Sequence, residues 1–404
     1  MSKNWKTHFT RREWLSASML ASGSWIAGAE LFSSARFLHA ATRFLSQHPE
    51  QDPFAGGKQL GIVDFVGEAG IPLDTPYNSE LDGRLNINLS SLGFTDVTVP
   101  IEKFYIRTRA SQLLDLTKPW TIRVGPPARQ SILAMPEIIR ESKPQGIHLM
   151  ECSGNSHIGH FGLLSAAEWT GMPISKLSDR LPLASGRTNY VLVSGFDTYV
   201  AHSENSIAGA SWIFPWDALV ATGAFLATKM GGEPLTRDHG APVRLMVPGW
   251  YGCVSIKWVN EITVVDDSTE ATSQMQEYAS RTHQQGVPKL AREYALATVD
   301  PAAVATRVEK WLVNNQIKYR IVGILWGGRE PVRNLEIRFN PDEDWAPVES
   351  IHRATVDSWS FWTQAWTPRK PGAYMIQLRV PDKSIRTIRL DMNYYARAVE
   401  ISDI

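Results

Sequence analysis

The C-terminal segment, residues 301–404, most constrains the fold, because short apolar stretches recur there between turn residues. The stretches are rich in β-branched and aromatic side chains, and Gly, Pro, Asn or Asp separates them. They read IKYRIVGILWGG, VRNLEIRF, WSFWTQAWTP, GAYMIQLRV and SIRTIRLDM. Repeated strands of this length are typical of an immunoglobulin-like β-sandwich. We therefore expect a β-sandwich domain over residues 301–404.

The region before the sandwich mixes strand and helix patterns, which predicts an α+β domain over residues 56–265. Residues 187–196 and 242–247 are β-branched runs that end at a Gly or a Pro, so we expect strands there. Residues 215–232 place apolar side chains at helical spacing before a glycine pair, so we expect one helix. Residues 266–300 are polar and are expected to be a linker.

The N-terminus has the order of an export signal. A paired arginine at Arg11 and Arg12 precedes a mildly apolar stretch that ends in small residues. This pattern predicts a twin-arginine signal peptide over residues 1–35, a spacer over 36–55 and a periplasmic location. An uncleaved membrane anchor is the alternative, but we expect no stable membrane insertion after export. Because this route carries folded proteins, we expect a buried cofactor.

The charge and cysteine content exclude several classes of function. Lys plus Arg and Asp plus Glu number 41 each, which gives no reason to expect a nucleic-acid partner. The two cysteines, Cys152 and Cys253, could pair in an oxidising compartment, but the sequence does not show whether they are close enough. No CxxC or CxxCH motif occurs, so we expect neither a structural zinc site nor haem attached to this chain.

Cys152 lies in HLMECSGNSHIGH, residues 148–160, and this setting has several readings. Zinc is one, because His148, His157 and His160 are near, although their spacing fits no standard ligand set. A nucleophile with His157 as base and an inert buried thiol are two others. The small residues around the cysteine leave room for a bulky group beside the sulfur. A thiolate that ligates a transition metal fits this setting and folded export.

The cysteine loop and four further stretches resemble the sulfite oxidase family, over about residues 55–404. In that family a single cysteine in the loop binds molybdenum held by a molybdopterin cofactor. The stretches are ECSGN (151–155), FYIR (104–107), SAAEWTG (165–171), GEPLTRDHGAPVR (232–244) with VPG (247–249), and Lys257–Trp258. The resemblance implies a molybdopterin-binding catalytic domain followed by a sandwich domain that forms a homodimer.

The resemblance also assigns roles to individual residues. Cys152 is expected to ligate molybdenum, while Arg107, Trp169 and Tyr278 are expected to face the substrate, with Arg389 as a weaker candidate for a second substrate arginine. The residues expected to hold the pterin or its phosphate are Arg107, Arg109, Asp197, His239, Arg244 and Lys257.

Two departures from the family pattern bear on the substrate. Ser156 and His157 stand where the animal enzymes have two arginines, so we expect His157 to replace a fixed positive charge with a titratable one. Arg109 stands where the family usually has a histidine that touches the cofactor. Both changes alter the cations around the expected anion.

The implied reaction is oxidation of sulfite to sulfate, with electrons passed to an external acceptor such as a c-type cytochrome. Sulfite is a compact dianion, and arginines suit it because they hold their charge and offer planar donors. A sulfane-sulfur dehydrogenase subunit or an S-oxide reductase of the same family is the alternative enzyme. A cofactor-free binding module is the alternative of another class.

Overall fold

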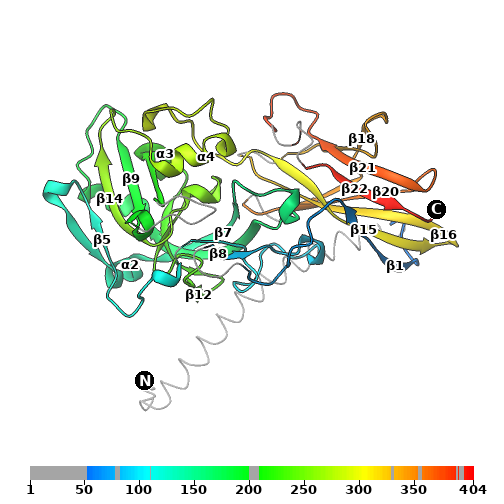
Figure 1. Ribbon diagram of the computed structural model, residues 1–404, viewed down its shortest axis with the longest axis horizontal. Helices are drawn as coiled ribbons and strands as arrows, with labels where there is room; N and C mark the ends of the chain where they lie inside the picture. The colour runs from blue at the N-terminus through cyan, green and yellow to red at the C-terminus, as the bar shows by residue number, and fades with distance from the viewer. Residues whose placement is uncertain are drawn as a thin grey trace, which may run out of the picture. The chain divides into compact units, whose positions relative to one another are not determined.

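The computed structural model describes residues 52–77, 82–109, 111–199, 209–328, 332–353, 357–387, 390 and 395–404. The expected signal peptide and nearly all of the expected spacer lie outside these ranges. Residues 57–404 form one compact unit, which Figure 1 shows with its strands labelled.

Two five-stranded sheets form the catalytic half. One sheet has the order β10-β9-β14-β5-β6, in which only β14 and β5 are parallel. The other has the order β12-β11-β8-β7, with β13 paired to β11. The strands are β5 (Thr121–Val124), β6 (Ser131–Ala134), β7 (Lys143–Glu151), β8 (Leu164–Pro173), β9 (Tyr190–Gly195), β10 (Ser211–Pro215), β11 (Phe225–Met230), β12 (Glu233–Pro234), β13 (Arg244–Met246) and β14 (Val259–Val265).

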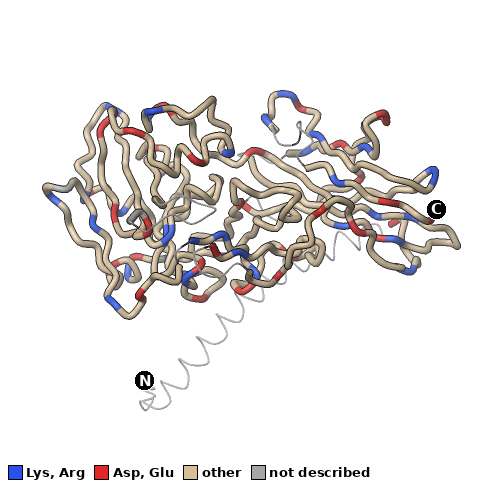
Figure 2. The backbone as a smooth tube through the Cα atoms, viewed as in Figure 1, with Lys and Arg blue, Asp and Glu red and all other residues tan. Residues whose placement is uncertain are grey.

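Shorter elements complete this half. A two-stranded ladder joins β3 (Arg84–Leu85) to β4 (Ile106–Arg107). The α-helices are α2 (Met135–Glu141), α3 (Trp216–Ala221) and α4 (Ser273–Tyr278). In the described ranges no helix is long and apolar enough to cross a membrane. Positions of basic and acidic residues are intermingled along the backbone, in keeping with the balanced composition (Figure 2).

Two more five-stranded sheets form the expected C-terminal sandwich. Their orders are β1-β15-β16-β20-β19 and β18-β17-β21-β22-β2. Asn314 and Asn315, both at positive φ, form the two-residue turn between β15 and β16. The strands are β1 (Lys58–Val63), β2 (Phe65–Val66), β15 (Ala302–Val313), β16 (Gln316–Trp326), β17 (Glu336–Arg338), β18 (Ala346–Pro347), β19 (Ser350–Arg353), β20 (Ser360–Trp366), β21 (Gly372–Arg379) and β22 (Arg397–Ile401).

Three local expectations differ from the structure. Residues 58–66, placed at the start of the catalytic domain from the sequence, pair with β15 and β22 and so complete the sandwich sheets. The helix expected over residues 215–232 ends at Ala221, because Gly223 takes a positive φ, and the rest is strand β11. The expected linker 266–300 contains α4 and buries Met275 and Ala279 completely, so it is packed structure. The strands expected over residues 187–196 and 242–247 are present as β9 and β13.

The apolar core joins the two halves. One cluster of buried side chains runs from Phe104 and Trp169 in the catalytic half to Val304 and Trp362 in the sandwich. A second cluster fills the space around β9 and β14 and includes Met275 of α4. Because the first cluster is continuous, the end of β7 packs directly against the sandwich. Cys152 follows directly after that end of β7.

Candidate active site

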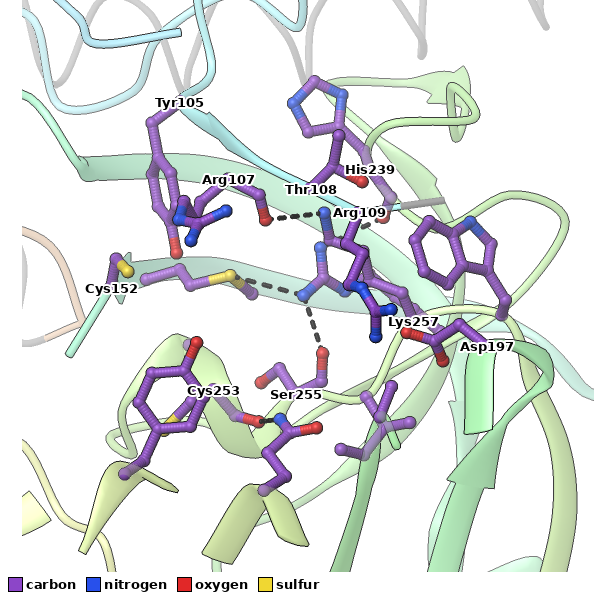
Figure 3. Close-up of a pocket in the computed structure, with 18 of the residues that line it drawn as sticks. Tyr105, Arg107, Thr108, Arg109, Cys152, Asp197, His239, Cys253, Ser255 and Lys257 are labelled. Carbon is purple, nitrogen blue, oxygen red and sulfur yellow. Dashed lines mark hydrogen bonds between the residues drawn. The ribbon is translucent and has the colours of Figure 1, made fainter. Parts of the chain in front are cut away.

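A pocket lies where the ends of several elements meet in the catalytic half. It is lined by residues that follow β4, β7, β9 and β13 and by residues of α4. Figure 3 shows Cys152 and Tyr105 on one side of this pocket and Asp197 and Lys257 on the other. The lining residues that the sequence predicted are Arg107, Arg109, Cys152, Asp197, His239, Arg244, Lys257 and Tyr278. Segments spread over residues 104–278 therefore meet in one place.

Cys152 stands in a tight turn that follows directly on β7. The Asn155 amide donates to the Cys152 carbonyl at 2.9 Å, which closes the turn. The Gly154 amide donates to Cys152 Sγ at 3.4 Å. This contact ties the sulfur to the backbone of its own loop. The side chain is buried but lines the pocket, and both cysteines are free thiols.

Glu151, the residue before the cysteine, ties the loop to the sandwich. Its carboxylate is buried and accepts the indole N–H of Trp326 at 3.0 Å and the hydroxyl of Tyr395 at 3.0 Å. Both partners are themselves buried. A buried carboxylate is costly unless it is hydrogen-bonded, and these two donors meet that need. The position of Cys152 is thereby coupled to two residues of the C-terminal domain.

Cys253 brings a second thiol to the same pocket. A Cβ on Gly252 would meet the Tyr105 hydroxyl at 2.5 Å, so only glycine allows this turn to approach so closely. Gln274 of α4 donates to the Cys253 carbonyl, which fixes the helix against the turn. Burial raises the pKa of the Cys253 thiol to about 12, although a hydrogen bond with Ser153 opposes the shift. Cys253 is therefore a neutral thiol at pH 7.

The side chain of Lys257 is hydrogen-bonded to the backbone of Arg107. The Lys257 ammonium donates to the carbonyls of Arg107, at 3.1 Å, and of Asp238. Burial, followed by the nearby Arg244 charge, lowers the pKa of Lys257 to about 7. The guanidinium of Arg107 lies 3.7 Å from the Asp82 carboxylate and keeps 19% of its side chain exposed. Arg107 is thus a partly exposed residue of the pocket lining.

His239 and Arg244 are largely occupied by the protein itself. His239 bridges the Thr236 hydroxyl at 2.8 Å and the Phe104 carbonyl at 3.1 Å, and burial lowers its pKa to about 4. Arg244 donates to the carbonyls of His239 at 3.0 Å and Ser255 at 2.8 Å, and burial lowers its pKa to about 10. The imidazole is therefore neutral, whereas the guanidinium remains a buried cation.

Three buried polar atoms of the pocket have no hydrogen-bond partner within the described part of the chain. They are Thr108 Oγ1, Asp197 Oδ1 and Arg244 Nε. Burial raises the pKa of Asp197 to about 6, while the Arg109 charge opposes that shift. Buried polar groups are normally hydrogen-bonded, so such atoms beside a pocket mark positions where a bound ligand can complete the bonding.

Tyr278 forms the wall that faces the cysteine. It ends α4, whose first turn is capped by the Thr272 hydroxyl accepting the Met275 amide at 3.2 Å. Burial, and next the negative charge of Cys152, raise the pKa of Tyr278 well above its ordinary value. The phenol is therefore a hydrogen-bond donor at neutral pH, on the same pocket as the sulfur and Arg107.

Two predicted substrate residues, Trp169 and His157, do not line this pocket. Trp169 is 1% exposed and donates to the His148 carbonyl at 3.2 Å, with its ring edge-on to Phe104, so it is a core residue behind the pocket wall. His157 is exposed, in a 3-10 turn after the cysteine loop, so its replacement of a substrate arginine is not supported by its position. Arg389 lies outside the described residues.

Sequence reasoning missed several lining residues, among them Thr108, Cys253, Gln274 and Glu277. Thr108 lies in the sequence between two predicted cations, Arg107 and Arg109, so its place in the pocket could have been inferred. Cys253 belongs to no recognised motif. Gln274 and Glu277 lie in a segment that was expected to be a linker, in which only Tyr278 was predicted, so the sequence contained no signal for these three residues. In the described ranges no three His, Cys, Asp or Glu side chains gather as a metal-binding group.

Comparisons with known proteins show which families and folds this chain resembles. Residues 110–273 match the family described as "Oxidoreductase molybdopterin binding domain". The sulfite oxidase of Gallus gallus is 28% identical over 246 residues, 56% of this chain and 50% of that protein. The chain is thus similar to the sulfite oxidase family of molybdopterin oxidoreductases.

Two further relatives show how far the likeness extends. The nitrate reductase [NADPH] of Neurospora crassa is 38% identical over 112 residues, 27% of this chain but 11% of that protein. The chain thus spans about a tenth of the nitrate reductases that it matches and half or less of the sulfite oxidases. The crystal structure of the sulfane dehydrogenase SoxCD from Paracoccus pantotrophus shares the fold, with a TM-score of 0.60, 15% identity and coverage of 88% of this chain and 98% of that chain.

The pocket has a donor set that fits a molybdopterin. A pterin carries amide-type N–H donors and ring acceptors, and its side chain ends in a phosphate. Asp197 Oδ1 can accept such N–H groups, whereas Thr108 Oγ1 can donate or accept and Arg244 Nε can donate. Lys257 and Arg109 add positive charge beside these atoms. The residues present therefore fit the group that the family binds.

Proposed function

We propose that this chain oxidises sulfite to sulfate in the pocket, with Cys152 as the protein ligand of molybdenum. The observation that supports this proposal is the convergence of Cys152, Arg107 and Tyr278 on a pocket that also has unpartnered buried polar atoms. A sulfur ligand, a substrate-side cation and a phenol donor are what oxidation of a small sulfur oxyanion requires. The second cavity, which Tyr77, Arg84 and Arg237 help to line, contains no cysteine.

The chain's own residues divide between holding the cofactor and holding the anion. Asp197, Thr108 and Arg244 would bind the pterin, and Lys257 and Arg109 would bind its phosphate. Once bound, the molybdenum group supplies oxygen-atom transfer and accepts two electrons. The Gly154 amide keeps the Cys152 sulfur ready to ligate, because it donates to that sulfur at 3.4 Å.

On the substrate side, Arg107 and Tyr278 would orient the anion. A dianion brought into a half-closed pocket loses hydration, and a guanidinium with a phenol O–H replaces part of it. The balanced reaction converts sulfite and one water into sulfate, two protons and two electrons. A one-electron acceptor such as a c-type cytochrome would take those electrons in two steps.

We also propose that the protein works in the periplasm after twin-arginine export, as a homodimer that forms through the sandwich domain. The paired arginine near the N-terminus supports the export route. Fractionation of cells that express the full chain, with and without Arg11 and Arg12 replaced by lysine, would test the location. Light scattering of the purified protein would test the dimer.

Steady-state kinetics with sulfite and ferricyanide test the proposed reaction. We expect sulfite-dependent reduction by protein that contains molybdenum, and a loss of at least ~100-fold in Cys152→Ser. The Cys253→Ser variant is the matched control, because it removes the other pocket thiol and should keep most of the activity. Molybdenum-loaded protein that oxidises thiosulfate-derived sulfane sulfur, or reduces S-oxides, but leaves sulfite untouched would refute the proposal.

A further inference from the structure

Arg281 lies beside the cysteine pocket, at a position that the sequence analysis did not single out. It belongs to the 3-10 turn Ser280–Thr282, which follows directly after α4. Its guanidinium lies 5.5 Å from the centre of the Tyr278 ring, and Tyr278 lines the pocket. The residue is exposed, so its charge is accessible from solvent. An exposed cation is therefore held against the pocket wall.

The guanidinium also approaches the cysteine loop. A Cβ built on Gly154 would have Arg281 Nη1 at 3.6 Å and Cys152 Sγ at 3.8 Å. The arginine and the sulfur thus flank the same point of the loop. Because Gly154 has no side chain, nothing from that residue stands between them. A small anion near the sulfur would therefore lie within reach of this guanidinium.

The backbone that carries Arg281 is fixed by its own hydrogen bonds. The Thr282 hydroxyl donates to the carbonyls of Tyr278 at 2.9 Å and Ala279 at 3.2 Å. The Gln284 amide donates to the Ala279 carbonyl at 3.0 Å. Thr282 is only 2% exposed, so these bonds are shielded from water. The backbone at the root of the Arg281 side chain is therefore held next to Tyr278.

Arg107 supplies the second cation at the same phenol. Its positive charge opposes the upward shift in the pKa of Tyr278, which places Arg107 near that ring, while Arg281 stacks on the ring. Arg107 comes from β4 and Arg281 from the turn after α4, so different elements contribute the two charges. Two guanidinium groups and a phenol O–H are thus arranged around the pocket that holds the Cys152 sulfur.

We propose that Arg281 binds the anionic substrate at the mouth of the pocket and makes the site selective for compact, doubly charged sulfur oxyanions. This inference rests on the proposed function, because it concerns the same pocket. It assigns to Arg281 the role that the sequence had predicted for His157, because Arg281 stacks on Tyr278, which lines the pocket. A dianion needs more than one fixed cation to offset the loss of its hydration, and Arg107 with Arg281 provides two.

Kinetics and binding of Arg281→Met test this proposal on the full-length, molybdenum-loaded protein. We expect the KM for sulfite to rise roughly tenfold or more, with kcat changed less than about threefold, because a charge-assisted contact to the anion is lost. Arg281→Lys should lie between wild type and Arg281→Met. Arg292→Met is the matched control, because Arg292 is another exposed arginine, in the separate 3-10 turn Ala291–Glu293. His157→Ala should also leave the KM unchanged.

Calorimetric titration with sulfate gives a readout that does not need turnover. Arg281→Met should weaken sulfate binding by about the same factor as it raises the KM. Unchanged sulfate binding and KM in Arg281→Met, or a larger effect in His157→Ala, would overturn the inference. If wild-type protein fails to oxidise sulfite, the proposed reaction fails, but sulfate binding still decides the role of Arg281. Equal binding by wild type and Arg281→Met would then refute the anion site.

Discussion

The carboxylate of Glu151 offers a quantitative test of how the cysteine loop is anchored. Its two oxygens accept the Trp326 indole N–H and the Tyr395 hydroxyl, each at 3.0 Å, and both donors are buried. Glu151→Ala would leave these donors without that acceptor. Each buried donor left unsatisfied costs about 1–3 kcal/mol, so the free energy of unfolding should fall by about 2–6 kcal/mol.

Glu151→Gln is the matched variant, because its side chain has nearly the same shape. The amide oxygen can accept the indole N–H, while the amide N–H₂ can donate to the Tyr395 oxygen, since a hydroxyl both donates and accepts. We therefore expect a loss of about 1 kcal/mol or less. Tyr395→Phe removes one donor from the wild-type carboxylate, and the cycle of Glu151→Gln with Tyr395→Phe isolates the coupling between the two residues.

Urea unfolding of the cofactor-free chain, followed by tryptophan fluorescence, measures these free energies without the stabilisation that bound cofactor adds. Molybdenum content of the same variants, expressed with the cofactor, reports on the loop itself. We expect Glu151→Ala to lose molybdenum as well as stability, because the anchor precedes Cys152 directly. An unfolding free energy for Glu151→Ala within about 0.5 kcal/mol of wild type would refute the reasoning, because such a change is typical of a surface substitution.

Two other groups of the pocket give predictions in the cofactor-free chain. The pKa of Asp197 is raised to about 6, so the folded chain binds a proton that the unfolded chain has lost. Stability should therefore fall by up to ~3 kcal/mol as the pH rises from about 4 to about 6, and Asp197→Asn should remove that slope in urea unfolding at several pH values. Because the pKa of the Cys253 thiol is raised to about 12, iodoacetamide at pH 7.5 should modify it at least ~100-fold more slowly than a free cysteine. Mass spectrometry of Cys152→Ser checks this, and fast alkylation of the folded variant would contradict the assigned burial.

The cofactor side of the pocket could be read from the sequence because its residues belong to contiguous motifs. Cys152, His239, Arg244 and Lys257 stand in short stretches whose local pattern resembles the family. The structure brings all four to one pocket. The sandwich could be predicted for a similar reason, since strand length and turn residues are local properties. Contiguous motifs, strand lengths and turn residues can be recognised without knowing which distant segments contact each other.

What the tertiary structure decided concerns contacts between segments far apart in the chain. Strand alternation does not say which face is buried, so only the packing of β8 shows that Trp169 is a core residue behind the pocket. Tyr278 reaches the pocket, and Arg281 stacks on its ring, because α4 packs on the catalytic half, although its segment resembles a polar linker. Glu151 meets Trp326 and Tyr395 only after the sandwich has docked. The sequence alone therefore determined which motifs are present, whereas long-range packing decided which side chains surround Cys152.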